Sequence, residues 1–248
     1  MIGFGKNLKN AEPTTIITTL TDNRLIRIDP QEDGFFEKVL NFKPKYNSYF
    51  KSEENEVKAF IEAVAEVKDA NIDPFYVPIY NPAEVGDNLV TYKNGKKSAL
   101  GHSYNWWVNT ASNMPVVEGR HWHLATEYQY YAFMVWLVNQ MIRDRMTVNE
   151  AIVNVVIDLT HYDNRLDSHD LWSDWHLMTG SKSVCGVYDL ANNSKILACS
   201  NGEAGSFWRC GGVQRSKCRG GETFQLASLN YCTDVDNNFD YSVGMLVL

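Results

Sequence analysis

The stretch TEYQYYAFMVWLVNQMI, residues 126–142, sets the centre of the fold. Thr126 and Gln129 have the spacing of a capping box, in which the Thr hydroxyl meets a backbone N–H three residues on and the Gln side chain reaches back. The apolar run that follows is far shorter than the ~20 residues needed to span a bilayer. We therefore expect a buried helix here and no membrane insertion.

Two further helices are predicted on either side of this one. Residues 53–69 carry apolar side chains at helical spacing, and Ser52 is placed to cap them. Thr147 and Glu150 form a second capping box, which predicts a helix over 148–159. The valines and isoleucines of that segment also allow a strand.

The remaining segments favour short strands. Residues 14–28 are rich in β-branched side chains and predict one or two strands, and residues 70–120 predict loops and short strands. Residues 181–248 alternate short apolar pieces with Gly, Asn and Asp turns, which indicates a β-rich and loop-rich C-terminal third. The expected fold class is α+β, with helices packed on small twisted antiparallel sheets in one domain, residues 1–248. The central helix should pack on a sheet that includes a strand near 242–248.

Charge and the N-terminal segment limit the function and the location. The chain has 23 Lys and Arg against 30 Asp and Glu, a formal charge of −7. A general nucleic-acid binder would carry a basic face, so we expect no nucleic-acid partner. The N-terminal residues lack the basic and apolar regions of a signal peptide, which fits a virion component assembled in the cytosol and an intracellular protein equally.

Three groups of side chains contain the residue types that bind metals, but each has a simpler explanation. His161, His169 and His176 lie among aspartates at no recognisable spacing and indicate a loop. Residues 121–123, HWH, predict a strand with a buried Trp. Residues 234–240 start like a calcium loop but lack its Gly and its Glu. The sequence also has no phosphate-binding Gly-rich loop, so we expect no metal site, no cofactor and no catalytic residues.

The cysteines leave their redox state open. All five lie in the last part of the chain, at Cys185, Cys199, Cys210, Cys218 and Cys232. The odd count leaves at least one unpaired, and the absence of a CxxC pair argues against zinc. One or two disulfides and free thiols are equally compatible with this pattern.

Residues 207–219, FWRCGGVQRSKCR, form a basic stretch in an acidic protein. One interpretation is a recognition surface with an aromatic anchor at Phe207 or Trp208. The other is a solvated loop whose charges offset the acidic remainder. The composition alone leaves both open.

Four motifs along residues 115–248 resemble, in order, those of the formylglycine-generating-enzyme type of C-type lectin fold. Residues 122–127, WHLATE, resemble its "RLPTEAEWE" helix start, and residues 186–193, GVYDLANN, resemble "GLYDMxGNVWE". Residues 209–212, RCGG, are similar to "RGGSW", and residues 243–245, VGM, resemble the closing "IGFR" strand. The resemblance implies a C-type lectin-like fold.

The family includes sulfatase-modifying enzymes and the variable proteins of diversity-generating retroelements. The enzymes use cysteines after their Gly-Gly, where this chain has Ser216, with Cys218 out of register. The resemblance therefore argues against enzymatic activity of that type. The variable proteins share the Gly-Gly elements and a GxF-type segment, which residues 220–226, GGETFQL, resemble.

The resemblance implies a ligand-binding, receptor-recognition protein with a variable region at residues 207–241, whereas residues 1–114 match poorly. Its partner would be a host or partner macromolecule, protein or glycan, as for phage receptor-binding proteins, and a homo-oligomer is compatible with it. The alternatives are a divergent sulfatase-modifying-factor-like enzyme and a structural phage protein.

We predict eight ligand-binding residues, mostly exposed and on one face. The paired glycines 211–212 and 220–221 should fix turns that display the side chains between them, while Phe224, Leu226 and Val243 should face the core. The predicted ligand-binding residues are Trp208, Arg209, Gln214, Arg215, Lys217, Leu229, Tyr231 and Asp234.

Overall fold

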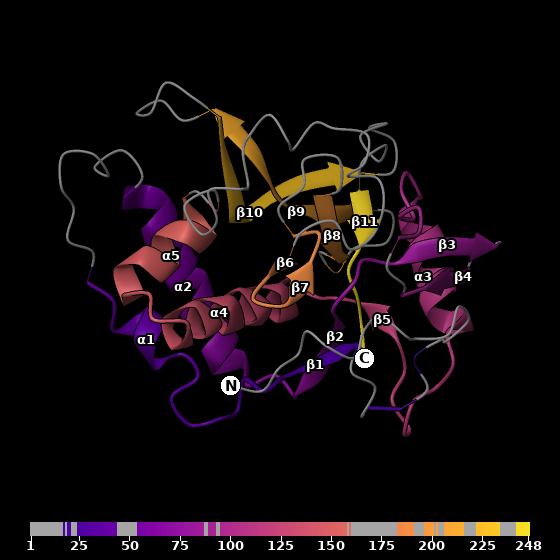
Figure 1. Ribbon diagram of the computed structural model, residues 1–248, viewed down its shortest axis with the longest axis horizontal. Coiled ribbons are helices and arrows are strands. Elements are labelled where there is room, and N and C mark those ends of the chain that lie inside the picture. The colour runs from indigo at the N-terminus through magenta and orange to yellow at the C-terminus, as the bar shows by residue number, and fades with distance from the viewer. Residues whose placement is uncertain are drawn as a thin grey trace.

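The computed structural model describes residues 17, 19–20, 24–43, 54–86, 89–92, 95–157, 159, 183–190, 196–200, 202, 206–215, 222–233 and 242–248. Within these ranges it contains five helices and twelve short strands (Figure 1). The helices are α1 Glu37–Leu40, α2 Glu54–Ala70, α3 Tyr104–Asn113, α4 Glu127–Arg143 and α5 Val148–Val156. The strands are β1 Leu25–Ile28, β2 Phe75–Pro78, β3 Ala83–Gly86, β4 Leu89–Thr91, β5 His123–Leu124, β6 Ser183–Val184, β7 Val187–Tyr188, β8 Ile196–Ser200, β9 Ser206–Arg215, β10 Glu222–Thr233, β11 Ser242–Gly244 and β12 Leu246–Val247. The chain is therefore α+β.

Helix α4 confirms the helix predicted for residues 126–142. The Gln129 backbone N–H donates to Thr126 Oγ1 at 3.2 Å, and the Thr126 N–H donates to Gln129 Oε1 at 3.0 Å, which completes the predicted capping box. Tyr130, Phe133 and Leu137 are fully buried along it. Local capping and burial of an apolar face together determine where this helix begins and how it lies.

Helices α1, α2 and α5 pack around α4 and lie together on one side of the molecule (Figure 1). Helix α2 confirms the helix predicted for 53–69, and α5 confirms the second capping box but ends at Val156 rather than at 159. Their buried faces and the strands beside them form the helical cluster, which includes Val57, Phe60, Val64, Tyr130, Phe133, Leu137, Ile152, Val155, Leu226 and Met245.

A four-stranded sheet covers this cluster, with strand order β10-β9-β8-β11. Strand β10 contacts both α4 and α5, and the Tyr130 hydroxyl donates to the Leu226 carbonyl at 2.6 Å. The prediction that the central helix packs on a sheet containing the C-terminal strand is therefore confirmed. The β8–β11 pair is parallel, whereas the other pairs in this sheet are antiparallel as expected.

The last residues of the chain lie between two hydrophobic clusters. Met245 and Val247 belong to the helical cluster, whereas Val243, Leu246 and Leu248 belong to a second one. From Met245 to Leu248 the side chains alternate between the two clusters, as in any extended segment. Val243 lies before the break between β11 and β12 and does not follow this alternation. Strand β12 pairs with β5, and the Leu248 backbone exchanges hydrogen bonds with β2, so the C-terminus lies beside β2 and β5 (Figure 1).

The second cluster, here the tryptophan cluster, contains Val90, Tyr92, Trp107, Ala111, Trp122, Leu124, Val243, Leu246 and Leu248. Its Trp107 comes from α3 and lies directly against Gly244. A Cβ at position 244 would lie 2.6 Å from Trp107 Cε3, closer than packed atoms approach. Glycine is therefore required where β11 meets this indole.

The structure confirms one expectation for the first half of the chain and corrects another. Strand β1, Leu25–Ile28, lies within residues 14–28, for which one or two strands were predicted, and Leu20 and Arg24 lie in turns. The segment 70–120, predicted as loops and short strands, contains the ten-residue helix α3. Its cap is Ser103, whose hydroxyl accepts from the Trp106 N–H at 3.2 Å. The predicted cap Ser52 lies outside the described residues.

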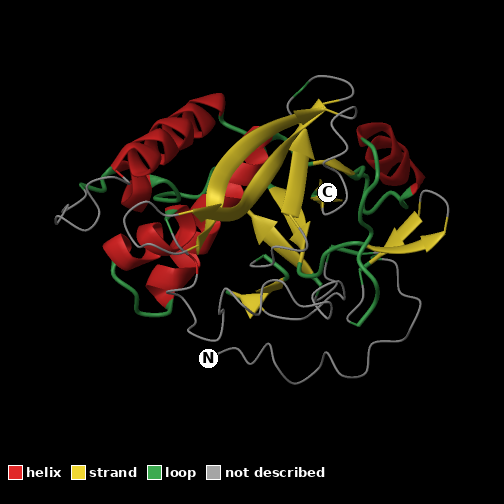
Figure 2. Cartoon of the chain, turned by 90° about the horizontal axis from the view of Figure 1, so that it is seen from above, coloured by secondary structure: helices red, strands yellow, loops and turns green. Residues whose placement is uncertain are grey.

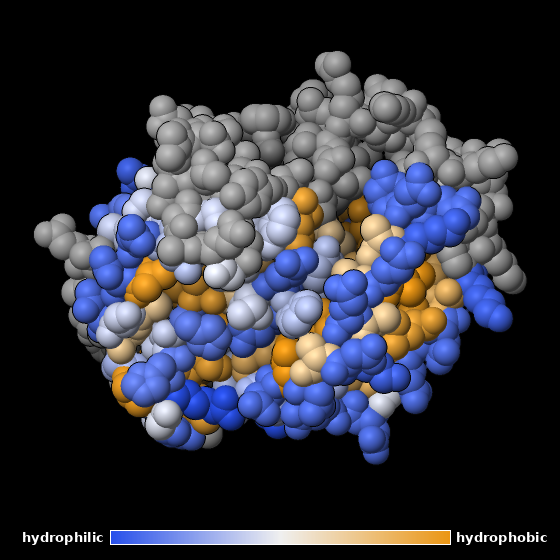
Figure 3. All heavy atoms as spheres, turned by 180° about the vertical axis from the view of Figure 1, so that it is seen from behind, coloured by the Kyte–Doolittle hydropathy of each residue, from blue (hydrophilic) through white to orange (hydrophobic). Residues whose placement is uncertain are grey.

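None of the described helices has the length and the apolar composition needed to cross a membrane. On the face shown in Figure 3, apolar side chains lie in patches separated by hydrophilic ones. The exposed large apolar residues are Val85, Val108, Val116 and Tyr128.

Candidate ligand-binding site

The predicted ligand-binding residues fall on and beyond β9 and β10, the two longest strands described. The strands pair antiparallel from Ser206–Thr233 to Arg215–Glu222, with an irregularity between Gln225 and Leu229. They form a long curved ribbon that rises from the sheet (Figures 1 and 2). The ribbon is thus fixed by the sheet along one edge of β9 and reaches beyond β8.

The glycines at 211 and 212 do not mark a turn, contrary to our expectation. Both lie inside β9, where Gly212 pairs with Gln225 of β10. The ladder therefore continues through the Gly-Gly step, and the side chains around it are not displayed by a tight turn there. The second glycine pair, at 220–221, lies outside the described residues.

Trp208 is half-buried rather than mostly exposed, which corrects the prediction for this residue. Its ring packs against the helical cluster, and its indole N–H faces the carboxylate of Glu127 in the first turn of α4. Burial raises the pKa of Glu127, the Trp208 N–H lowers it, and the nearby Glu66 carboxylate raises it again. Trp208 therefore joins β9 to the N-terminal end of the central helix.

Leu229 is also half-buried, and the prediction that it is mostly exposed is wrong as well. It pairs with Cys210 in the ladder and packs against the helical cluster. The next pair along β10 is Asn230 with Arg209, and the one after it is Tyr231 with Trp208. Successive pairs of a ladder belong to opposite faces of the sheet, so the positions of Arg209 and Trp208 do not share a face.

Two other predicted residues, Gln214 and Arg215, are neighbours on β9, so their positions also belong to opposite faces of the ladder. Gln214 pairs with Thr223 and Arg215 pairs with Glu222 at the far end of the ribbon. Lys217 and Asp234 lie outside the described residues. Of the three residues expected to face the core, Leu226 and Val243 are buried, which confirms them, and the Phe224 side chain is outside the description.

The GVYDLANN motif forms part of a short hairpin of β6 and β7. Cys185 and Gly186 have φ of 52° and 83°, as the two central residues of a tight primed turn require. Tyr188 stacks on Tyr80 with ring centroids 4.7 Å apart, and its N–H donates to the Ile79 carbonyl at 2.7 Å. This hairpin is thereby fixed to the segment that follows β2.

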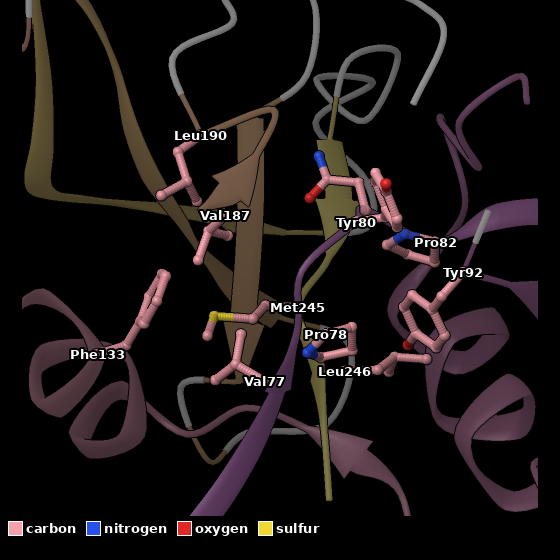
Figure 4. Close-up of a pocket in the computed structure, with 11 residues that line it drawn as sticks. Val77, Pro78, Tyr80, Pro82, Tyr92, Phe133, Val187, Leu190, Met245 and Leu246 are labelled. Carbon is pink, nitrogen blue, oxygen red and sulfur yellow. The ribbon is translucent and has the colours of Figure 1, made fainter. Parts of the chain in front are cut away.

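A small cavity lies beside this hairpin, between the two hydrophobic clusters (Figure 4). Two buried polar atoms at its wall, Asn81 Nδ2 and Tyr92 Oη, have no hydrogen-bond partner among the described residues. Burial raises the pKa of both Tyr80 and Tyr92. The lining is Val77, Pro78, Tyr80, Asn81, Pro82, Tyr92, Phe133, Val187, Leu190, Met245 and Leu246.

Sequence reasoning missed this cavity, because its lining comes from segments that are distant in the chain. It found only the resemblance of the GVYDLANN segment, without the partner segment 79–82. Most of the lining is apolar, so the cavity offers few groups that would orient a polar ligand.

Within the described part of the chain, His, Cys, Asp and Glu do not gather in any group of three that could hold a metal ion. His121 and His123 are exposed on either side of Trp122, whose predicted burial is confirmed, whereas the strand predicted for HWH begins only at His123. His123 Nε2 lies 3.1 Å from Gln129 Oε1. The cluster at His161 to His176 and the acidic segment 234–240 lie outside the described residues.

Comparison of the chain with protein-family models, with curated proteins and with solved structures found no match.

Proposed function

We propose that this chain is a ligand-binding protein that displays a diversified surface on a C-type lectin-like scaffold. In this proposal a diversity-generating retroelement of a phage, virus or prokaryote rewrites the coding segment for residues 207–241. The ligand is a host or partner macromolecule, protein or glycan. The proposed protein has no enzymatic activity and needs no cofactor.

The observation that carries the proposal is how the β9–β10 ribbon is anchored. Ser206 and Cys210 are buried at alternate positions of β9, and Trp208 between them is half-buried against α4. The intervening positions, such as Arg209, belong to the other face of the ribbon. A strand held by every second residue keeps its backbone path while the remaining residues change, which is how rigid scaffolds carry variable recognition surfaces.

The positions of the family-like motifs support the scaffold part of the proposal. The WHLATE motif supplies β5 and the cap of α4, and the VGM motif supplies β11. Gly244 of that motif lies against Trp107, so a structural requirement explains its glycine. The first and last of these motifs meet where the Ala125 N–H donates to the Met245 carbonyl at 2.7 Å.

The DNA that flanks the gene tests this function without knowledge of the ligand. We expect a near-copy of the stretch that encodes 207–241, differing from it mainly at adenines and lying beside a reverse-transcriptase gene. The matched control is the stretch that encodes α4 and α5, residues 126–156, for which no such copy should exist. Absence of the near-copy, or a copy that covers both stretches equally, would contradict retroelement diversification and favour a structural phage protein or a sulfatase-modifying type of enzyme.

A further inference from the structure

Two cysteines on neighbouring strands of the sheet lie in direct contact. Cys199 is on β8 and Cys210 on β9, and their Sγ atoms are 3.2 Å apart. In the ladder Cys199 pairs with Trp208 and Cys210 pairs with Leu197, so the two thiols are diagonal neighbours. Both side chains are buried, at 0% and 4% exposure.

This geometry needs little change to accommodate a covalent bond. Both are free thiols, and the sulfurs must approach by about 1 Å to reach the disulfide bond length. Because the residues are diagonal neighbours, the bond also requires the two strands to move slightly toward each other at this point. A thiol pair buried beside Trp208 is also shielded from reductants once the strands have docked. Cys185 lies apart from this pair, in the β6–β7 turn.

We propose that Cys199 and Cys210 form an intramolecular disulfide when the chain folds in the presence of a small-molecule disulfide such as oxidised glutathione. One protein thiolate attacks the glutathione disulfide, releases one glutathione thiolate and forms a mixed disulfide. The other protein thiolate then attacks the protein sulfur of that mixed disulfide and releases the second glutathione. Two protein thiols are oxidised, one glutathione disulfide is reduced to two thiols, and the two protein protons go to the released thiolates.

The burial of the two thiols determines at which stage of folding the disulfide forms. Burial is the largest influence that raises the pKa of Cys210, and contact with Cys199 raises it further. Because the thiolate is the attacking species, the pair reacts slowly in the folded protein and faster while β9 is undocked. The resulting bond links β9 to β8 beside Trp208, and it does so whatever ligand the ribbon recognises.

Peptide mapping of the full chain tests the proposal, because trypsin separates all the cysteines. The full chain is refolded with oxidised glutathione, its free thiols are alkylated in denaturant without reduction, and the digest is analysed by mass spectrometry. We expect residues 196–209 joined to residues 210–215, lighter than the two separate peptides by two hydrogen atoms. Recovery of both peptides alkylated, or joined instead to the peptide of Cys218 or Cys232, would overturn the proposal.

Variants give a second readout. Cys185→Ser is the matched control and should retain the linked peptide, whereas Cys199→Ser and Cys210→Ser should lose it. The oxidised unaltered chain should melt several degrees above the reduced one, and Cys199→Ser should abolish this difference. If a variant fails to fold, the map of the unaltered chain still decides, because it requires no substitution.

Discussion

The helical cluster and the tryptophan cluster are both buried, yet their large aromatic side chains differ in how their polar atoms are satisfied. Among the helices Asn139 and Asn154 each donate through Nδ2 to a backbone carbonyl and leave Oδ1 without a partner among the described residues. In the helical cluster the Tyr130 hydroxyl donates to the Leu226 carbonyl at 2.6 Å. In the tryptophan cluster Tyr92 Oη, Trp107 Nε1 and Trp122 Nε1 are buried with no hydrogen-bond partner among the described residues. Leaving such a group unsatisfied costs ~1–3 kcal/mol.

This difference indicates which part of the molecule is the more stable. The helical cluster gathers four helices and a four-stranded sheet around one apolar centre. The tryptophan cluster is held together by close packing of its rings. The Tyr92 and Trp122 rings stack with centroids 5.4 Å apart, and Trp107 packs directly against Gly244. We infer that the tryptophan cluster opens first under denaturing conditions, because Tyr92, Trp107 and Trp122 each bury a polar atom that makes no hydrogen bond within the described part of the chain, whereas the buried amides of the helices each keep a bond to a carbonyl.

The largest predicted effect lies where the two clusters meet. Gly244→Ala should lower the free energy of unfolding by about 3 kcal/mol, since the new Cβ collides with the Trp107 indole, which is itself buried. Urea denaturation measures the change. In the background of Trp107→Ala the same substitution should cost much less, and an equal cost in both backgrounds would show that the contact is not the cause.

Two conservative substitutions sharpen the comparison between the clusters. Tyr130→Phe should cost about 2 kcal/mol, because it leaves the Leu226 carbonyl without its donor in a buried setting. Tyr92→Phe removes a hydroxyl that lacks a partner, so it should be neutral or stabilising. Chemical denaturation of both variants checks this, and equal destabilisation by the two would refute the distinction.

The smallest predicted effect concerns the helix caps. Thr147→Ala should cost about 1 kcal/mol, the usual value of a lost N-cap. The hydrogen bonds from Thr147 lower the pKa of Glu150, so the stability they contribute is present above the ordinary pKa of Glu and is lost as the pH falls through the lowered one. Thr147→Ala should therefore cost more at neutral pH than in acid. It should raise the pKa of Glu150 only part of the way, because the backbone N–H of residue 147 still donates to the carboxylate, as NMR titration would show.

Helix α4 provides the matched control for that titration. Its capping box has Gln129 where α5 has Glu150, and an amide does not titrate. The cost of Thr126→Ala should therefore not share the pH dependence that Glu150 gives to Thr147→Ala. A similar pH dependence of both variants would mean that another group is responsible.

The sequence predicted the fold best where the signals are local. The capping box at Thr126 and the apolar run after it predicted α4 to within a residue at either end. Helix α3 was missed because Tyr104–Asn113 is rich in Asn, Trp, Thr and Ser, which are weak helix formers. It is stabilised by a contact between Trp107 and Gly244 that no local pattern reveals.

The candidate site was predicted less well, for a related reason. Paired glycines were interpreted as turns, but Gly211 and Gly212 lie inside β9. The side chains after them therefore continue to point to alternate faces of the strand. The burial of Trp208 depends on Glu127 and the first turn of α4, which are distant in sequence. Alternation in a strand is readable from sequence only when one face is clearly apolar, and Ser206, Trp208 and Cys210 do not form such a pattern.

A substitution library over β9 and β10 tests the central claim, that the ribbon has an anchored set of positions and a tolerant set. Arg209 and Arg215 are each replaced by many residue types, as are the buried Ser206, Cys210 and Leu226, and resistance to proteolysis reports the folded fraction. We predict that most substitutions at the first two positions leave the folded fraction unchanged and that most at the buried three reduce it strongly. Equal intolerance at both sets would contradict the proposal that this ribbon is a diversified recognition surface.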